Sequence, residues 1–180
     1  MLMSAENACL LIVDVQQRLL TAMDSPRAVM SGCSLMMKAA GVLDVPIVVT
    51  EQYPEGLGPT VEPLAELAPE DAFFSKVHFS SAKNPAIRGK IDSLKPDQVI
   101  IAGIEAHVCV LQSAIGLTEA GYQCFVAADA TSSRSASNHA AAMSRLREAG
   151  VGIVTSEMIV FEWLEKAGSP EFRELSRLLK

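Results

Sequence analysis

Residues 99–110 read VIIAGIEAHVCV, and this stretch decides the fold. Its first four residues form a short, apolar, β-branched run that Gly103 closes, a pattern typical of a strand buried on both faces. Apolar residues then recur at helical spacing until a stop signal at Gly121. The stretch therefore predicts a strand that leads directly into a helix, with Cys109 in the first turn of that helix.

Two interpretations of Cys109 follow from this position. Amide hydrogens in the first turn of a helix point outward, and the positive end of the helix dipole favours a thiolate. These effects predict a nucleophile with a lowered pKa. Cysteine is also among the most commonly buried residues, so Cys109 can equally be a small apolar side chain in the core. The stretch alone leaves both interpretations open.

Apolar runs alternate with helical patterns along the rest of the chain. This alternation predicts an α/β fold, a three-layer α-β-α sandwich with a six-stranded parallel sheet, in a single domain over residues 1–180. A turn-rich loop over residues 51–60 is too long for a minimal connection, which is common for functional loops. The predicted strands are 8–13, 45–50, 72–76, 99–102, 122–127 and 151–155, and the main predicted helices are 26–42, 84–94, 108–117, 137–149, 157–166 and 170–179.

Composition excludes several classes of function. The 180 residues carry a net charge of −6 without a run of basic residues, so we expect no nucleic-acid partner and no binding to anionic membranes. The first residues lack the cationic segment of a signal peptide, and no apolar run is long enough to span a membrane. The four cysteines show no paired spacing, which is typical of a reducing compartment. We therefore expect a cytoplasmic protein.

Three chemically active side chains follow predicted strands. Asp14 follows the first strand, Lys76 follows the third, and Cys109 follows the fourth. Because ligands in parallel sheets bind beyond the carboxyl ends of the strands, we expect the three to converge at one edge. A buried carboxylate and a buried ammonium can compensate one another, a nearby lysine lowers the pKa of a thiol, and a carboxylate can accept its proton.

These residues lie in motifs that resemble a known family. The segments IVDVQ (12–16), SKVHFSS (75–81) and GIEAHVCV (103–110) are similar to the isochorismatase-like cysteine hydrolases, and the match spans nearly the whole chain. Three further segments resemble the isochorismatase domain-containing subgroup, whose members largely lack an assigned substrate. These are TEQYPEGLGPTV (50–61), DATSSRS (129–135) and PEFREL (170–175).

The resemblance implies a catalytic triad with Cys109 as nucleophile, Asp14 as general base and Lys76 as electrostatic partner. It also implies a cis peptide between Ile104 and Glu105, which turns the amides of Glu105 and Cys109 toward the developing oxyanion. The expected function is hydrolysis of an amide or related C–N bond, or of an ester or vinyl ether, in a small-molecule substrate through a thioester intermediate. The alternative is a non-catalytic binding or regulatory protein on the same fold. A homo-oligomer is expected as well.

The sequence departs from the metal-dependent members of that family. Where nicotinamidases carry an Asp-x-His segment after the second strand, residues 51–53 read EQY, and the three histidines lack ligand spacing. We therefore expect no metal and no cofactor. A nucleotide-binding fold is disfavoured because the chain lacks a G-x-G-x-x-G motif.

Weaker candidates surround the triad. Gln16, Gln52 and His78 are candidates for substrate binding, although each can instead have an ordinary loop role. His107 stands two residues before Cys109, a poor geometry for a dyad on a helix, so we expect it to pack or to face a neighbouring subunit.

Overall fold

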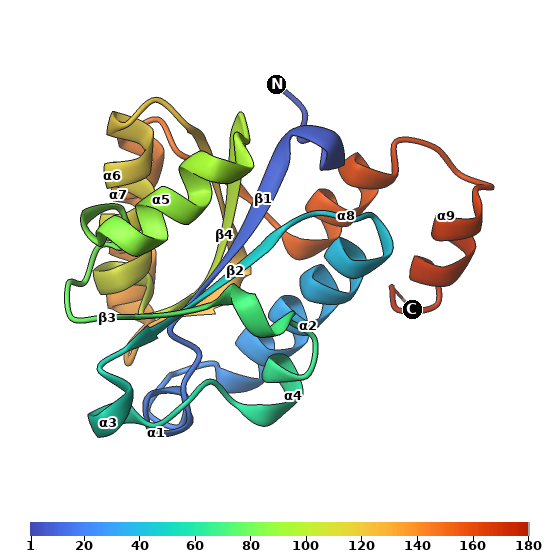
Figure 1. Ribbon diagram of the computed structural model, residues 1–180. Coiled ribbons are helices and arrows are strands. Elements are labelled where there is room, and N and C mark those ends of the chain that lie inside the picture. The colour runs from blue at the N-terminus through green and yellow to red at the C-terminus, as the bar shows by residue number, and fades with distance from the viewer. Residues whose placement is uncertain (180) are drawn as a thin grey trace.

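The computed structural model describes residues 1–179, so Lys180, the last residue of the predicted domain, lies outside the described residues. Its centre is a six-stranded, all-parallel sheet with the strand order β3-β2-β1-β4-β5-β6 (Figure 1). The predicted fold class is confirmed. The strands are β1 (Ala8–Val13), β2 (Ile47–Gln52), β3 (Phe73–Lys76), β4 (Gln98–Ile104), β5 (Gln123–Ser132) and β6 (Gly152–Val154).

Helices cover both faces of this sheet, as Figure 1 shows. One face packs against α2 (Pro26–Val42), α4 (Glu62–Ala65) and α8 (Ser156–Leu164). On the same side but farther from the sheet lies α9 (Pro170–Leu175), whose Leu175 joins the same hydrophobic cluster. The other face packs against α5 (Pro85–Leu94), α6 (Leu111–Glu119) and α7 (Ala136–Glu148). The short helices α1 (Gln17–Leu20) and α3 (Pro54–Leu57) lie beside each other at the end of the sheet where β1 and β2 finish.

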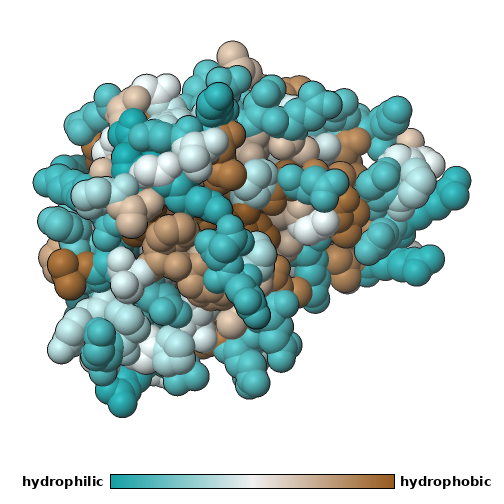
Figure 2. All heavy atoms as spheres, in the orientation of Figure 1, coloured by the Kyte–Doolittle hydropathy of each residue, from teal (hydrophilic) through white to brown (hydrophobic). Residues whose placement is uncertain are grey.

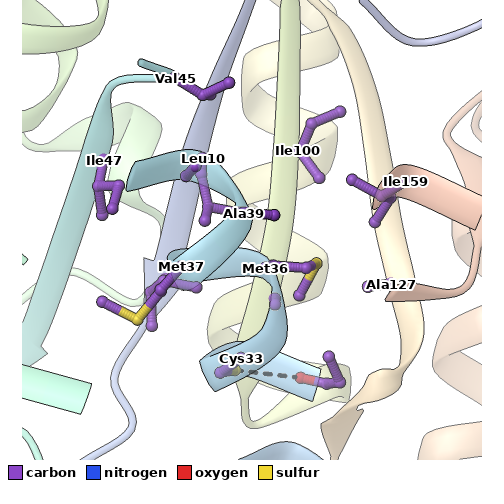
Figure 3. Packing of buried hydrophobic residues seen from close by; sticks show 14 of the residues in the cluster. Leu10, Cys33, Met36, Met37, Ala39, Val45, Ile47, Ile100, Ala127 and Ile159 are labelled. Atoms are coloured by element: carbon purple, nitrogen blue, oxygen red, sulfur yellow. Dashed lines mark hydrogen bonds between the residues drawn. The ribbon is translucent and has the colours of Figure 1, made fainter. Parts of the chain in front are cut away.

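The alternation of side chains along β1 divides the core into two clusters. Leu10 and Ile12 point to the face covered by α2, where Met36 and Met37 fill the space between helix and sheet (Figure 3). Leu11 lies in the other cluster, with residues of α5 and α6. All six residues of β1 are buried, which explains why its sequence is a continuous apolar run and does not alternate between apolar and polar residues.

Gly103 allows β4 to approach β1 closely. Its φ is +112°, and a Cβ atom at this position would lie 2.1 Å from the backbone oxygen of Val13. A side chain fits neither the backbone conformation nor the space. The pairing of β4 with β5 also shifts register between Ile101 and Gly103. The glycine therefore fixes the path of the chain two residues before Glu105.

Three differences from the sequence-based expectation lie near the carboxyl ends of the strands. Strand β2 extends to Gln52 because Glu51 and Gln52 pair with Ser75 and Lys76 of β3, so the predicted loop begins later. Strand β5 extends to Ser132, into the segment predicted as a polar loop, because it continues to pair with the end of β4. The helix after β4 begins with a π-helical turn over Ala106–Val110.

The face of the molecule seen in Figure 2 is mainly polar. Figure 2 shows hydrophilic side chains over most of the face in view, with hydrophobic side chains in its middle and on its right-hand part. Within residues 1–179, none of the helices combines the length and the apolar character that crossing a membrane requires.

We expect Gly103→Ala to lower the free energy of unfolding by about 3 kcal/mol or more, because the added methyl group meets the backbone of β1. Gly89→Ala in α5 is the matched control, since a Cβ there has open space, and it should be neutral or stabilise the protein by about 0.5–1 kcal/mol. Urea denaturation of both variants measures the difference. Equal stability of the two variants would contradict this account of the β4 path.

Candidate active site

The structure brings the predicted triad to one edge of the sheet. Asp14 follows β1, Lys76 is the last residue of β3, and Cys109 lies in the π-helical turn after β4. Their exposed fractions are 0%, 3% and 4%, so all three are buried. Three polar or ionisable side chains thus meet where a parallel sheet places its ligands.

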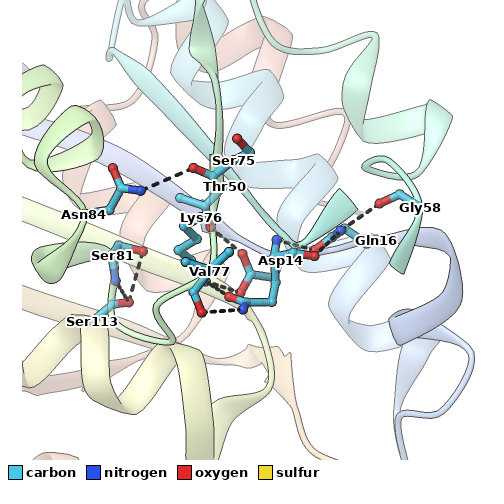
Figure 4. Close-up of polar contacts among 11 residues, drawn as sticks. Asp14, Gln16, Thr50, Gly58, Ser75, Lys76, Val77, Ser81, Asn84 and Ser113 are labelled. Carbon is cyan, nitrogen blue, oxygen red and sulfur yellow. Dashed lines mark hydrogen bonds and ion pairs between the residues drawn. The ribbon is translucent and has the colours of Figure 1, made fainter. Parts of the chain in front are cut away.

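Asp14 and Lys76 form a buried ion pair. The Nζ of Lys76 lies 2.6 Å from the Oδ2 of Asp14, and the side chains of both residues have no exposed surface (Figure 4). The hydroxyl of Thr50 donates a hydrogen bond of 2.7 Å to the other carboxylate oxygen of Asp14. Each carboxylate oxygen therefore has a donor, which is what a charge in the protein interior requires.

Gln52 holds the other side of the lysine. Its Oε1 accepts a hydrogen bond of 2.7 Å from the Nζ of Lys76, and its Nε2 donates to the backbone oxygen of Val77. An ammonium group has three N–H donors, and Asp14 and Gln52 account for two. The third donor is available to a neighbour such as a thiolate. Gln52 therefore contacts the triad directly and fixes the direction of the Lys76 side chain.

The backbone turns sharply at Asp14. Its φ is +52°, in the left-handed region that aspartate tolerates better than most residues. The Asp14 amide still donates to the backbone oxygen of Thr50, and the Asp14 carbonyl accepts from the amide of Gln16. This turn ends β1 and keeps the Asp14 side chain against β2 and β3.

The acidity of Cys109 differs from the sequence-based expectation. The pKa of its thiol is raised to about 12, first by burial and then by the negative charge of Asp14, while Lys76 acts in the opposite direction. The prediction of a lowered pKa was wrong because it counted the helix dipole and the lysine but not burial or the ion pair. Asp14 neutralises Lys76, and a buried site disfavours a thiolate. At rest, Cys109 is therefore a thiol beside a carboxylate.

Gln16 has a structural position. Its side chain is fully buried. The Nε2 of Gln16 donates hydrogen bonds to the backbone oxygens of Gln52 and Gly58, and its Oε1 accepts one from the backbone N–H of Gln52. The side chain of Glu51 accepts two hydrogen bonds from Thr60 on the same loop. The segment over 53–60 is thus tied to β1 and β2, and the Gln16 amide is occupied by protein partners.

The segment before Cys109 is tied to the end of β5. The peptide bond between Ile104 and Glu105 is cis. The carboxylate of Glu105 accepts hydrogen bonds from the backbone and the Nε of Arg134, at 3.3 and 3.0 Å. The Nδ1 of His107 lies 2.9 Å from the hydroxyl of Ser133. His107 therefore packs against the chain after β5.

The rim of the site is partly apolar. Val77 and Phe79, on either side of His78, are 72% and 53% exposed, and Tyr53 is 55% exposed. His78 is itself exposed, and no hydrogen bond joins it to another of the described residues. A hollow of about 260 Å³ is lined by Tyr53 and Lys76 among others. These side chains border the triad on its β3 side.

Sequence reasoning missed two contributors to the site. Thr50 was interpreted only as the end of a strand, although a threonine beside the carboxyl end of β1 can reach an aspartate there. Arg134 lies in a segment for which the sequence leaves two roles open, binding a polar substrate group or beginning the next helix, and no local pattern pairs it with Glu105, 29 positions away. Residues 1–179 contain no group of three or more His, Cys, Asp or Glu side chains placed to hold a metal ion.

Comparison with known proteins identifies the family. The model of the isochorismatase domain matches residues 8–158, which is most of the chain. The chain belongs to the isochorismatase domain family. A curated relative, isochorismatase domain-containing protein 2 of Rattus norvegicus, is 36% identical over 176 residues, covering 97% of this chain and 82% of the relative.

Two solved structures share the isochorismatase fold. The MAR1 ribonuclease of Caenorhabditis elegans superposes with a TM-score of 0.93 at 33% identity, covering 99% of this chain and 92% of that one. The YcaC gene product of Escherichia coli, described as an octameric hydrolase of unknown specificity, superposes with a TM-score of 0.90 at 22% identity, covering 99% and 87%. Membership of the isochorismatase family supports hydrolase activity, and some of its members have no known substrate.

We expect Asp14→Asn to lower the pKa of the Cys109 thiol, because the carboxylate that raises it is gone and Lys76 remains to pair with a thiolate. At about pH 8, near the pKa of a free cysteine, iodoacetamide should then label Cys109 faster than in the wild type. Lys76→Met should slow labelling, because the charge that lowers the pKa is removed.

Peptide mass spectrometry across a pH series measures labelling at each cysteine. Cys9 and Cys33 are internal controls, since burial raises the pKa of both thiols to about 12 and neither touches the triad. A wild-type Cys109 that titrates near pH 8.5, as a free thiol does, would show that this account of the site is wrong.

Proposed function

We propose that this protein is a metal-independent cysteine hydrolase that cleaves an amide or related C–N bond, or an ester or vinyl ether, in a small molecule. The observation that supports the proposal most is the buried ion pair of Asp14 and Lys76, whose two charges shift the pKa of the Cys109 thiol in opposite directions. Burying two charges is unfavourable unless they are paired and hydrogen-bonded. A thiol whose pKa is strongly shifted, next to such a pair, is typical of a functional site. A purely structural cysteine needs neither neighbour.

The proposed reaction begins with the thiol. The carboxylate of Asp14 accepts the proton of Cys109 as the Sγ atom attacks the carbonyl carbon of the substrate, and a tetrahedral oxyanion forms. The main-chain amides of Glu105 and Cys109 are the proposed oxyanion donors. When the tetrahedral species collapses, the C–N bond breaks, and the leaving amine takes the proton from Asp14.

The second half of the reaction regenerates the enzyme. A water molecule gives a proton to Asp14 and attacks the thioester carbonyl, and the bond to Sγ breaks as the carboxylic acid leaves. The Cys109 thiolate then recovers its proton from Asp14. Lys76 holds the Asp14 carboxylate in place through its hydrogen bond of 2.6 Å, and its third N–H donor is directed to the thiolate while the proton is away.

We propose a homo-oligomer, because Tyr53, Val77 and Phe79 expose apolar surface beside the triad and because the YcaC relative is described as octameric. We also propose a reducing, cytoplasmic setting, because all four cysteines are buried free thiols. His78 stays a candidate for substrate contact at the rim, and Gln52 acts on the substrate only through Lys76.

Two alternatives are tested by the same assay. A non-catalytic binding protein would have no need for the ion pair beside Cys109. Ribonuclease activity is suggested by the description of the Caenorhabditis elegans relative. The net charge of −6 and the small, buried reaction centre disfavour a polyanionic substrate here.

The decisive screen offers the protein small amides, carbamoyl compounds, esters and a short RNA. For any substrate that turns over, we expect Cys109→Ala to reduce kcat at least about 1,000-fold, and Asp14→Asn to have a similar effect, because each removes a group that the chemistry uses. Intact-mass spectrometry of the wild type should also show an acyl adduct on Cys109 during turnover.

Cys124→Ala is the matched control, because Cys124 is also buried but lies on β5 away from the triad. It should retain activity. Circular dichroism confirms that each variant is folded. Turnover that survives Cys109→Ala would refute the cysteine mechanism, and cleavage of RNA alone would favour the ribonuclease alternative.

A further inference from the structure

We infer that Arg134 is a carboxylate-binding residue of the active site, so that the substrate is a small molecule with an anionic group besides the bond that is cleaved. This inference rests on the proposed function, because it assigns a substrate class to the same site.

Arg134 lies at the same sheet edge as the nucleophile. Ile104 at the end of β4 pairs with Ser132 at the end of β5, so the two neighbouring strands end opposite each other. Glu105 then begins the turn that contains Cys109, and Arg134 follows β5 two residues after Ser132. Neighbouring strands are about 4.8 Å apart, so the segments that follow β4 and β5 begin close together. Asp14 and Lys76 lie beyond the opposite side of β4.

The buried end of Arg134 is held by Glu105. One carboxylate oxygen of Glu105 accepts from both the backbone N–H and the Nε of Arg134, and the Glu105 side chain is only 11% exposed. His107 adds a third contact between the two segments through Ser133. The Nε side of the guanidinium is therefore fixed to the segment that carries Cys109.

The outer end of Arg134 has no such partner. A guanidinium has five N–H donors, and Glu105 occupies only the one on Nε. The Arg134 side chain is 62% exposed, and among residues 1–179 no acceptor is bound to its terminal nitrogens. The backbone N–H of Asp24 donates a hydrogen bond to the backbone oxygen of Ser133, next to Arg134. The carboxylate of Asp24, however, makes no ion pair with Arg134.

A fixed guanidinium whose two terminal nitrogens are unpaired has the geometry to bind a carboxylate through two parallel hydrogen bonds. The two terminal nitrogens present parallel N–H donors that suit the two oxygens of that group, and the preorganised fork loses little entropy on binding. A purely structural link between β4 and β5 accounts for the Nε contact and leaves the fork unexplained. With the reacting carbonyl at Cys109, the anionic group of the substrate would extend toward β5, away from Lys76.

The test uses two alkylating reagents that differ in one group. Iodoacetate and iodoacetamide both form a bond between Sγ of Cys109 and carbon as iodide leaves, but only iodoacetate carries a carboxylate. The measured quantity is the ratio of the iodoacetate to the iodoacetamide rate at Cys109, by peptide mass spectrometry, divided by the same ratio for glutathione. This ratio cancels changes in thiol acidity, because both reagents need the same thiolate.

We expect Arg134→Gln to lower the ratio about five- to tenfold, the size expected for one partly exposed charge-assisted hydrogen bond. Arg134→Lys should retain part of the ratio, because it keeps the charge but not the fork. Arg147→Gln is the matched control. It removes the same charge from an exposed residue at the far end of α7 and should leave the ratio unchanged.

The outcomes separate this inference from the proposed function. An equal ratio in the wild type and Arg134→Gln, with Cys109 reactive toward both reagents, overturns the carboxylate site and leaves the hydrolase proposal intact. An equal loss in Arg147→Gln also overturns it, because the effect would then come from net charge. A folded wild type whose Cys109 reacts with neither reagent at any pH overturns the proposed function and this inference with it.

Discussion

The buried ion pair of Asp14 and Lys76 is the constraint on which the rest of the site depends. Both side chains have no exposed surface, so each charge is stabilised only by the other and by the donors and acceptors around them. Thr50 satisfies the carboxylate, and Gln52 satisfies the ammonium. The removal of one partner from such a pair typically costs about 3–5 kcal/mol, because the remaining charge is left uncompensated.

This constraint explains why the strands end where they do. Strand β2 continues to Gln52 because that residue must reach Lys76 at the end of β3, and Gln16 fixes the Gln52 backbone from the β1 side. The left-handed turn at Asp14 then directs the carboxylate toward both neighbours. A framework of hydrogen bonds therefore holds these groups in place, and groups fixed in this way would lower the cost of reorganisation in the proposed reaction.

The sequence predicted the large-scale organisation of the fold and much of the site. The buried strands are apolar runs that differ from helical patterns, so their positions along the chain followed from local periodicity, and the parallel sheet followed from their alternation with helices. The convergence of Asp14, Lys76 and Cys109 followed from topology, because parallel strands place their carboxyl ends at one edge. The family resemblance followed from the motifs around these residues.

The rest depends on contacts that no local pattern records. The raised pKa of Cys109 depends on which charges neutralise each other and how deeply the thiol is buried. The roles of Thr50 and Gln52 depend on the register of three strands, and the contact between Glu105 and Arg134 joins segments 29 positions apart. Residue type and spacing along the chain do not determine such pairings.

The most direct test of this account is a double-mutant cycle between Asp14 and Lys76, measured as the free energy of unfolding in urea. We predict that Asp14→Asn and Lys76→Met each destabilise the protein by about 3–5 kcal/mol, because each leaves a buried charge unpaired. The double variant should be far more stable than the sum of the two losses implies, with a coupling of about 2 kcal/mol or more. Additive losses would mean that the two charges do not depend on each other, and the central claim about this site would be wrong.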